Sequence, residues 1–493
     1  MVVGTKLNKG PSKMTTSLNY IIYKPRQNIT LNMIEAEKYE AALIVQQLVG
    51  NLIYYSNKGR YEPRLAEKWE ILPNNSWAFT LKKNLKCETG EEITPKSFKQ
   101  SLDRSIYIYS KLGGVPIMSN LIGYESFLKE NADNKNIFEL KSSAGIKYDD
   151  NHIIFEFDKK IKSGLLQILS FTPFGYICDK NFNADGSWKD DKVFISSGPY
   201  KVDKIAVGES YLISKNKYWA DFTRSAPEQV LFTHDENQID ATQPTIIDAF
   251  TNDYDNIKLK KYKLVPEYIN SILLGNLKNG YFSKLKSREY FRYLINKTSK
   301  EILPLEFGAN TRSDSFYPNQ DMYSVGSDEI PAVEKPISNL IIEGSIPLEG
   351  TSRWHAWLVL KNVLEKNNLT YAFAKNEALF AEITNRNYDI RIRGSSIGGG
   401  VEAWGLYVEF CTAMGINFPD PSGRVCNALK DYEDDKINDA QLTERFFKYI
   451  KEDSAILPIS HYGVSLFLSE HIDLSSISPL ISIMRLDQIS LEP

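Results

Sequence analysis

Residues 61–102 constrain the fold more than any other part of the chain, because strand, turn and helix signals follow one another there without a gap. The sequence predicts a helix end at 63–66 and a strand over 68–72, followed by an Asn-Asn turn. A second strand over 77–81 alternates Trp, Phe and Leu with smaller residues, which is typical of a strand with one buried face. Short elements of both kinds therefore follow one another, as in a mixed α/β domain.

The end of this stretch and four later segments carry equally ordered signals. A helix is predicted to begin at Thr94, with Pro95 as its first residue, because a threonine cap followed by proline is typical of a helix start. Residues 145–157, GIKYDDNHIIFEF, predict two strands joined at an Asp-Asp turn. Residues 197–219, SGPYKVDKIAVGESYLISKNKYW, predict a hairpin that turns at Gly208.

Two later segments complete the series. A strand closes on Asn276 and a helix follows it within residues 274–302, and residues 453–467, DSAILPISHYGVSLF, predict a strand near the end of the chain. These blocks, taken in order, resemble the family 5 extracytoplasmic solute-binding proteins, the oligopeptide- and dipeptide-binding components of bacterial ABC importers.

The resemblance implies an α/β fold class and, more closely, a two-lobed periplasmic-binding-protein fold of type II with the extra domain of the peptide-binding cluster. Lobe one would comprise residues 14–46, 169–262 and 470–493, the extra domain 47–168, and lobe two 263–469. The lobes would close by hinge motion on a peptide or peptide-like solute, held by strand-like main-chain bonds, and present it to an ABC transporter permease. No reaction would be catalysed, and the protein would be a monomer, peripheral to the membrane in the periplasm or at the cell surface.

Composition agrees with a folded protein of several domains. The chain has 493 residues and is 42% hydrophobic, which predicts two or three cores rather than one. A formal net charge of −3 gives no electrostatic reason to expect a nucleic-acid partner. No apolar run approaches the roughly 20 residues that a membrane span needs.

The N-terminal residues 1–16 are polar and lack the apolar core of a secretion signal. Because the resemblance implies secretion, we expect that a signal or lipoprotein leader is missing from this numbering. A cytosolic, ligand-sensing relative is the alternative. A strand over 17–23 and a helix over 41–55, with its apolar side facing inward, are predicted to follow.

The last third of the chain alternates strands with helices. Strands are predicted at 338–342, 369–374 and 388–394, with helices at 353–367 and 376–384 between them. This alternation predicts a largely parallel sheet with helices on its faces.

The four cysteines, Cys87, Cys178, Cys411 and Cys426, show no C-x-x-C spacing and therefore give no zinc signature. Cys411 and Cys426 flank a loop rich in Gly, Asn and Pro and would form a disulfide in an oxidising compartment. Four reduced thiols are the alternative.

Signatures of catalysis, metals and cofactors are weak or absent from the sequence. The five histidines form no H-E-x-x-H motif, and the Asn183-Asp185-Gly186 start of an EF-hand-like loop lacks its closing Glu, so no metal is predicted. No nucleophile elbow occurs. The run 398–403, GGGVEA, follows its strand too late to hold a dinucleotide, so no cofactor is predicted. We interpret that run as a ligand-cleft loop, with a plain structural turn as the alternative.

The strand before that run carries alternating charges. Asp389, Arg391 and Arg393 lie on one side of the predicted strand. A solvent-facing side on which Asp389 screens the arginines is the first interpretation. An arginine pair that binds a carboxylate or another anion is the alternative.

The loop after this strand departs from the family pattern. Peptide-binding relatives carry an Asp there that neutralises the ligand's α-amino group, and this chain has Gly398 at that place, next to Gly399. The salt bridge to a free amine is therefore missing unless Glu402 supplies it, and Trp404 would give a stacking wall. The predicted ligand contacts are Arg391, Arg393, Gly398, Gly399, Glu402 and Trp404. An anionic solute that is not a peptide is accordingly an alternative ligand, and an enzyme using the cleft is the remaining alternative.

Overall fold

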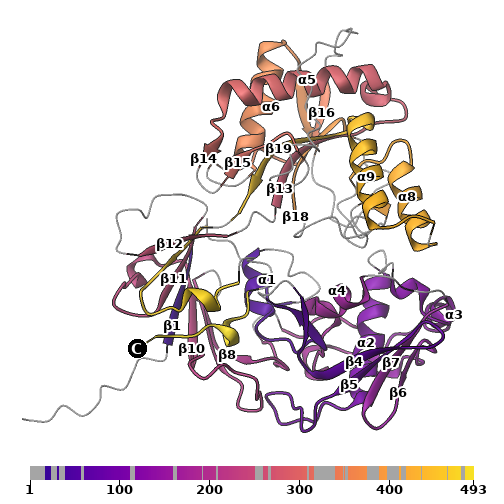
Figure 1. The fold of residues 1–493 in the computed structure, drawn as a ribbon, viewed down its shortest axis with the longest axis vertical. Coiled ribbons are helices and arrows are strands. Elements are labelled where there is room, and N and C mark those ends of the chain that lie inside the picture. Colours follow the sequence, from indigo (N-terminus) through magenta and orange to yellow (C-terminus); the bar gives the residue numbers. More distant parts are fainter. Residues whose placement is uncertain are drawn as a thin grey trace, which may run out of the picture.

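The computed structural model places most of the chain in two lobes that face one another, one above the other in Figure 1. The structure describes residues 17–23, 30–32, 39–56, 60–111, 117–158, 161, 164–190, 193–206, 209–249, 259–264, 268–307, 310–315, 339–347, 349, 353–374, 388–396, 410–411, 418–434, 436–463, 465–478 and 484–492. Among these residues, none of the helices is long and apolar enough to cross a membrane.

A seven-stranded sheet forms the centre of the first lobe, in the order β12-β20-β11-β1-β10-β9-β8. Its strands are β1 (Ser17–Tyr23), β8 (Tyr200–Ala206), β9 (Ser210–Lys215), β10 (Gln229–Thr233), β11 (Thr245–Ala249), β12 (Lys260–Lys263) and β20 (Ser465–Leu468). The central strand β1 runs parallel to both of its neighbours, β10 and β11, and the other pairs are antiparallel. The predicted strand over 17–23 and the predicted hairpin of β8 and β9 are thus confirmed.

The extra domain packs beside this sheet. It contains the four-stranded sheet β4-β5-β7-β6 and the hairpin β2-β3. Its elements are β2 (Ile53–Tyr55), β3 (Tyr61–Pro63), β4 (Ala66–Leu72), β5 (Ser76–Leu81), β6 (Ile146–Tyr148), β7 (His152–Glu156), α2 (Pro95–Ser110), α3 (Tyr124–Glu130) and α4 (Leu165–Ser170). One continuous hydrophobic core contains Leu18 and Phe232 of the first sheet together with Phe98 and Phe155 of this domain, so the two pack as one body.

The second lobe is built on a second seven-stranded sheet, in the order β14-β15-β19-β13-β18-β16-β17. Its elements are β13 (Tyr268–Leu274), β14 (Glu306–Phe307), β15 (Asn310–Arg312), β16 (Leu340–Glu343), β17 (Tyr371–Ala374), β18 (Ile390–Ser396), β19 (Ile456–Tyr462), α5 (Leu285–Ile302), α6 (Trp354–Lys366), α8 (Arg424–Glu433) and α9 (Asp439–Asp453). The two faces of β13 pack into different cores: Ile269 and Leu273 join the core of α8 and α9, whereas Ile272 and Leu274 join that of α5 and α6. Helices therefore cover both faces of this sheet.

Short helices complete the fold. They are α1 (Tyr39–Val45) and the 3-10 helices η1 (Met118–Asn120), η2 (Ile137–Glu139), η3 (Thr172–Phe174), η4 (Asp179–Asn181), η5 (Glu236–Gln238), η6 (Tyr281–Ser283), η9 (Leu474–Ser476) and η11 (Leu486–Gln488).

The start of α2 is where the sequence predicts it. Thr94 caps the helix by accepting a hydrogen bond from the backbone N–H of Ser97, whose hydroxyl accepts one from the N–H of Thr94, and Pro95 is the first helical residue. Two donors that would otherwise lack a partner are thereby satisfied.

Two local predictions near the beginning of the chain were wrong. The helix expected over 41–55 ends at Val45, because the next residues bond to distant parts of the chain: the side-chain amide of Gln47 donates to the carbonyl of Met484, and the N–H of Gly198 donates to that of Leu48. The helix end expected at 63–66 is instead the end of β3 and the start of β4. Long-range hydrogen bonds outweigh local helix propensity at both places.

The sheet of the second lobe is less parallel than the alternating pattern predicts. Strands β16, β17 and β18 are parallel to one another, but β13 runs antiparallel to both β18 and β19. Strand β20 bonds to β11 and β12 in the first sheet, although the sequence-based boundary assigned residues up to 469 to lobe two. The other lobe boundaries stay predictions, and the helix predicted at 376–384 lies outside the described residues.

Neither of the two disulfides links the second lobe to the rest of the molecule. Cys87 bonds to Cys178 in the body formed by the first sheet and the extra domain. Cys411 bonds to Cys426 in the second lobe, which is the one disulfide that a sequence-based alternative expected. The chain has four cysteines, so both disulfides together use all of them.

A buried ion pair fixes the C-terminal segment, residues 484–492, to the body formed by the first sheet and the extra domain. The Arg64 guanidinium lies 2.8 Å from the Asp487 carboxylate, and the two side chains are 3% and 0% exposed. The guanidinium also lies over the ring of Trp219, 4.7 Å from its centre. Nearby, Arg485 donates to the carbonyl of Gln46, and burial lowers the pKa of Arg485 to about 10. The segment is therefore held by the ion pair and by hydrogen bonding to the main chain, while the cation–π contact with Trp219 fixes the guanidinium of Arg64 in place.

We expect Asp487→Asn to destabilise the protein by about 3–5 kcal/mol, because the substitution leaves the Arg64 charge buried without its partner. Asp221→Asn is the matched control: it breaks the exposed pair of Asp221 with Lys82 and should cost no more than about 1 kcal/mol. Urea unfolding followed by tryptophan fluorescence measures both changes. Equal losses in the two variants would contradict the role given to the buried pair.

Candidate functional site

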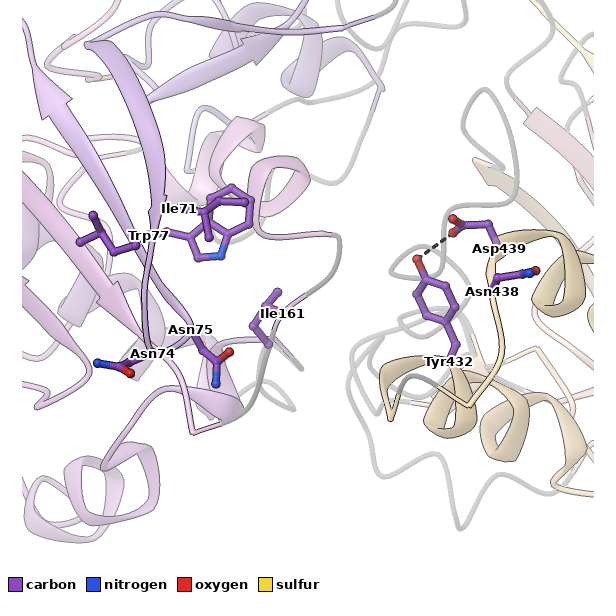
Figure 2. Close-up of a pocket in the computed structure, with 9 residues that line it drawn as sticks. Ile71, Asn74, Asn75, Trp77, Ile161, Tyr432, Asn438 and Asp439 are labelled. Atoms are coloured by element: carbon purple, nitrogen blue, oxygen red, sulfur yellow. Dashed lines mark hydrogen bonds between the residues drawn. The ribbon is translucent and has the colours of Figure 1, made fainter.

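A cavity of about 580 Å³ lies between the extra domain and the second lobe. Its walls are Ile71, Leu72, Asn74, Asn75, Trp77 and Ile161 on one side and Tyr432, Asn438 and Asp439 on the other. Figure 2 shows the two groups facing one another across an open gap. Residues more than 350 positions apart in the chain thus share one space between the lobes.

The first wall is the end of the β4-β5 hairpin. Asn74 and Asn75 form its turn with φ angles of 63° and 59°, a left-handed conformation that Asn adopts more readily than most residues. Asn75 is directed toward the gap in Figure 2. Beside it, the Ile71 side chain is 67% exposed, the highest value among the large apolar residues that the structure describes.

The second wall is the connection between α8 and α9. Asn438 caps α9 by accepting a hydrogen bond from the N–H of Gln441, and the side chain of Gln441 accepts one from the N–H of Asn438. The Tyr432 hydroxyl donates to Asp439 Oδ1 at 2.7 Å, which fixes the carboxylate at the cavity wall (Figure 2). Of the nine described residues that line this cavity, only Asp439 carries a formal charge, so this part of the wall favours neutral or cationic groups over anions.

The predicted arginines lie on β18, in the second lobe. Arg391 pairs with Glu343 of the neighbouring β16 at 3.0 Å, with side-chain exposures of 11% and 7%. Arg393 is half-buried and lies opposite Ser271 of β13. The charge of Arg391 is thus already balanced within the protein.

The solvent-facing interpretation of this strand side was wrong. Asp389 and Arg391 are each only 9% exposed. Asp389 does not screen the arginines: its carboxylate accepts hydrogen bonds from the Asn276 side chain at 2.9 Å and from the Ile341 N–H at 2.8 Å. Strand β18 lies between β13 and β16 in its sheet. The charged side chains of this segment therefore have neighbouring strands beside them and hold the strand ends together.

A polar and aromatic cluster accompanies the end of β18. Tyr268 and Tyr462 stack with ring centres 5.0 Å apart, and the Asn270 side chain donates to Ser460 Oγ at 3.2 Å. A Cβ on Gly394 would lie 2.9 Å from the Tyr462 hydroxyl, so only glycine lets this hydroxyl approach the strand so closely. Sequence reasoning missed this cluster, although the alternation of Tyr268 and Asn270 in one strand was a signal for it.

The remaining predicted contacts, Gly398, Gly399, Glu402 and Trp404, lie outside the described residues. Sequence reasoning also missed the cavity itself. The Asn-Asn turn was recognised only as a turn, and nothing in the sequence pairs it with Asp439. No group of three or more His, Cys, Asp or Glu that could hold a metal occurs in the described part of the chain.

Two adjacent chain segments connect the lobes. The first runs from β12 to β13 and the second from β19 back to β20. On the side of the first sheet, Lys263 lies opposite Ser465, and on the side of the second sheet, Tyr268 lies opposite Tyr462. The described ends of these two connections are therefore paired in antiparallel fashion on the side of each lobe, an arrangement that can act as a hinge.

Comparison with protein families gives one match that covers most of the chain. The sequence profile of the family described as bacterial extracellular solute-binding proteins, family 5 Middle, matches residues 60–389. Among curated proteins, a Haemophilus influenzae protein named only as a binding protein is 26% identical over 230 residues, which are 46% of this chain and 39% of that protein. The matches to curated relatives span about two fifths of the relatives' length or less.

Solved structures match over nearly the whole chain. The substrate-binding domain of an oligopeptide ABC transporter from Bacillus anthracis has a TM-score of 0.70 at 15% identity, covering 98% of this chain and 99% of that one. NikA from Brucella suis, solved in complex with Fe(III)-EDTA, has a TM-score of 0.68 at 14% identity, covering 97% of this chain and 100% of that one. At these identities the likeness shows the fold alone, a mixed α/β fold of two lobes.

We expect Arg391→Met to destabilise the protein by about 3–5 kcal/mol, because it leaves Glu343 buried and without its ion partner. The double variant Arg391→Met with Glu343→Gln removes both charges and should lose distinctly less stability. Chemical unfolding of the single and double variants measures the difference. A loss of stability in the double variant equal to the sum of the losses in Arg391→Met alone and Glu343→Gln alone would show that the two side chains do not act as a pair.

Proposed function

Because the chain belongs to the bacterial extracellular solute-binding proteins of family 5, we propose that it captures a peptide or peptide-like solute between its lobes and delivers it to the permease of an ABC importer. The observation that carries this proposal is the joining of two separate lobes by two paired segments, with an open cavity between them. Rotation about these segments closes the lobes on a solute and excludes water from it. The protein itself binds and releases its ligand without changing it.

The disulfides support a location outside the cytoplasm. Disulfides form and persist in oxidising compartments, and this structure pairs Cys87 with Cys178 and Cys411 with Cys426. We propose that the protein acts as a monomer in the periplasm or at the cell surface, held near the membrane by its permease or a lipid anchor. The same observation weighs against a cytosolic ligand-sensing role.

The ligand contacts proposed from the sequence gain one refinement. Arg391 pairs with Glu343, and to Arg393 on the same strand we assign contact with an anionic group of the ligand. Arg391 then acts by fixing the position of the strand. Gly398 and Gly399 would let main-chain amides approach the ligand, with Trp404 as a stacking wall and Glu402 as a polar contact.

We expect ligand to close the lobes. Native mass spectrometry of freshly purified protein identifies a retained ligand, and small-angle X-ray scattering then compares the protein before and after its removal. The radius of gyration should be smaller with ligand, and a hundredfold excess over Kd should stabilise the fold by about 2.7 kcal/mol. The same shape with and without a ligand of verified binding would refute hinge closure.

The charge of the ligand forms a separate prediction. Free peptides, N-acetylated peptides and unrelated anionic solutes are compared by calorimetry on the wild type, Arg393→Ala and Glu402→Gln. We expect Arg393→Ala to weaken binding of carboxylate-bearing ligands about 10-fold or more, because a charge-assisted contact is lost. Tight binding of free peptides that is lost only in Glu402→Gln would show that Glu402 binds the amine and that the ligand is an ordinary peptide.

A further inference from the structure

The cavity between the lobes is bounded by two corners of the fold that face one another. The hairpin corner comprises Ile71, Asn74 and Asn75 of the extra domain, and the helix corner comprises Tyr432, Asn438 and Asp439 of the second lobe (Figure 2). We infer that these corners bind each other when the lobes close and so form a latch that stabilises the closed state. This inference rests on the proposed hinge closure and adds a contact that lies outside the predicted ligand site.

Apolar surface at the hairpin corner gives the first argument. Ile71 exposes 67% of its surface toward solvent in the open arrangement, on an edge strand whose other outward residues include Glu67, Lys68 and Glu70. An isoleucine so placed remains in contact with water for as long as the lobes stay apart. Contact with the helix corner would remove this surface from water and thereby favour closure.

Polar complementarity gives the second argument. Asp439 is exposed, and its carboxylate already accepts one hydrogen bond from Tyr432, which leaves acceptor capacity on the other oxygen. Asn75 carries an amide group with two donor hydrogens and is directed toward the gap. Among the described residues that line the cavity, Asp439 alone carries a formal charge, so these residues bring no like charges together when the corners meet.

Rigidity of both corners gives the third argument. The hairpin turn contains Pro73, and Asn74 and Asn75 are both held at positive φ. On the other side, Asn438 is fixed by its reciprocal hydrogen bonds with Gln441, and Asp439 by Tyr432. Because both surfaces are already ordered, a contact between them loses little conformational entropy.

The test is a cysteine cross-link that forms only if the corners meet. Asn75→Cys is combined with Asn438→Cys in the full chain without added ligand, and copper phenanthroline is the oxidant. All four native cysteines are in disulfides, so the two new thiols are the only free ones. A disulfide requires the two Cα atoms to approach to within roughly 7 Å, which makes its formation a report of contact.

The control pair replaces Asn75 by another asparagine that has the same left-handed backbone conformation. Asn84→Cys with Asn438→Cys uses another asparagine of the same domain with almost the same φ, 60° against 59° for Asn75, but outside the cavity wall. A second pair, Asn75→Cys with Lys436→Cys, leaves the Asn438 cap intact if the first pair folds poorly, with Asn84→Cys and Lys436→Cys as its control. Mass spectrometry and thiol labelling measure the rate of cross-linking.

We expect both Asn75 pairs to cross-link about 10-fold or more faster than their controls, because repeated closure raises the effective concentration of the thiols. Cross-linking rates equal to those of the controls would overturn the latch. This holds even if small-angle scattering shows that ligand closes the lobes. A ligand that fills this cavity in the closed state would give that same negative result. Cross-linking without any ligand-dependent change in scattering would keep the latch and count against the proposed function instead.

Discussion

The buried pair of Arg64 and Asp487 makes one rigid unit of pieces drawn from both ends of the chain. Arg64 lies at the entrance to the extra domain, Asp487 lies in the last segment of the chain, and Trp219 packs on the guanidinium from the end of the β9 hairpin region. A pair this deeply buried tolerates little displacement, because separation would leave two charges in an apolar surrounding. The first sheet and the extra domain therefore move together, and relative motion is left to the connection between the lobes.

Local structure was predictable wherever neighbouring residues decide it. The cap at Thr94, the β4-β5 turn and the hairpin of β8 and β9 depend on contacts within a few residues, and the structure contains each of them. Predictions failed where a partner from far along the chain decides the outcome. The helix at 41–55 stops early because Gln47 bonds to residues near 484–486, and the charged side of β18 is buried because Glu343 supplies the opposite charge.

The site shows the same division. The resemblance led to β18 and the loop after it, and the structure shows that β18 is held by the pair of Arg391 with Glu343. The cavity could not be predicted, because its walls come from 71–77, 161 and 432–439 and only the folded chain brings these segments together. The charges also differ between the two places: Asp439 gives the cavity a negative character, while Arg393 lies on the strand that we assign to an anionic ligand group.

The two connecting segments between the lobes limit the motion in a mechanical sense. A pair of antiparallel segments, hydrogen-bonded at each end, behaves as a ribbon that bends across its thin dimension but resists stretching and sideways shear. In the proposed closure, such a ribbon would leave the lobes one soft degree of freedom, where a single flexible tether would allow several. The proposed closure would then follow one path and bring the two walls of the cleft together in one register. On binding, a ligand would then have to restrict one rotation of the lobes rather than several. Less conformational entropy would be lost, which leaves more of the contact energy available as affinity.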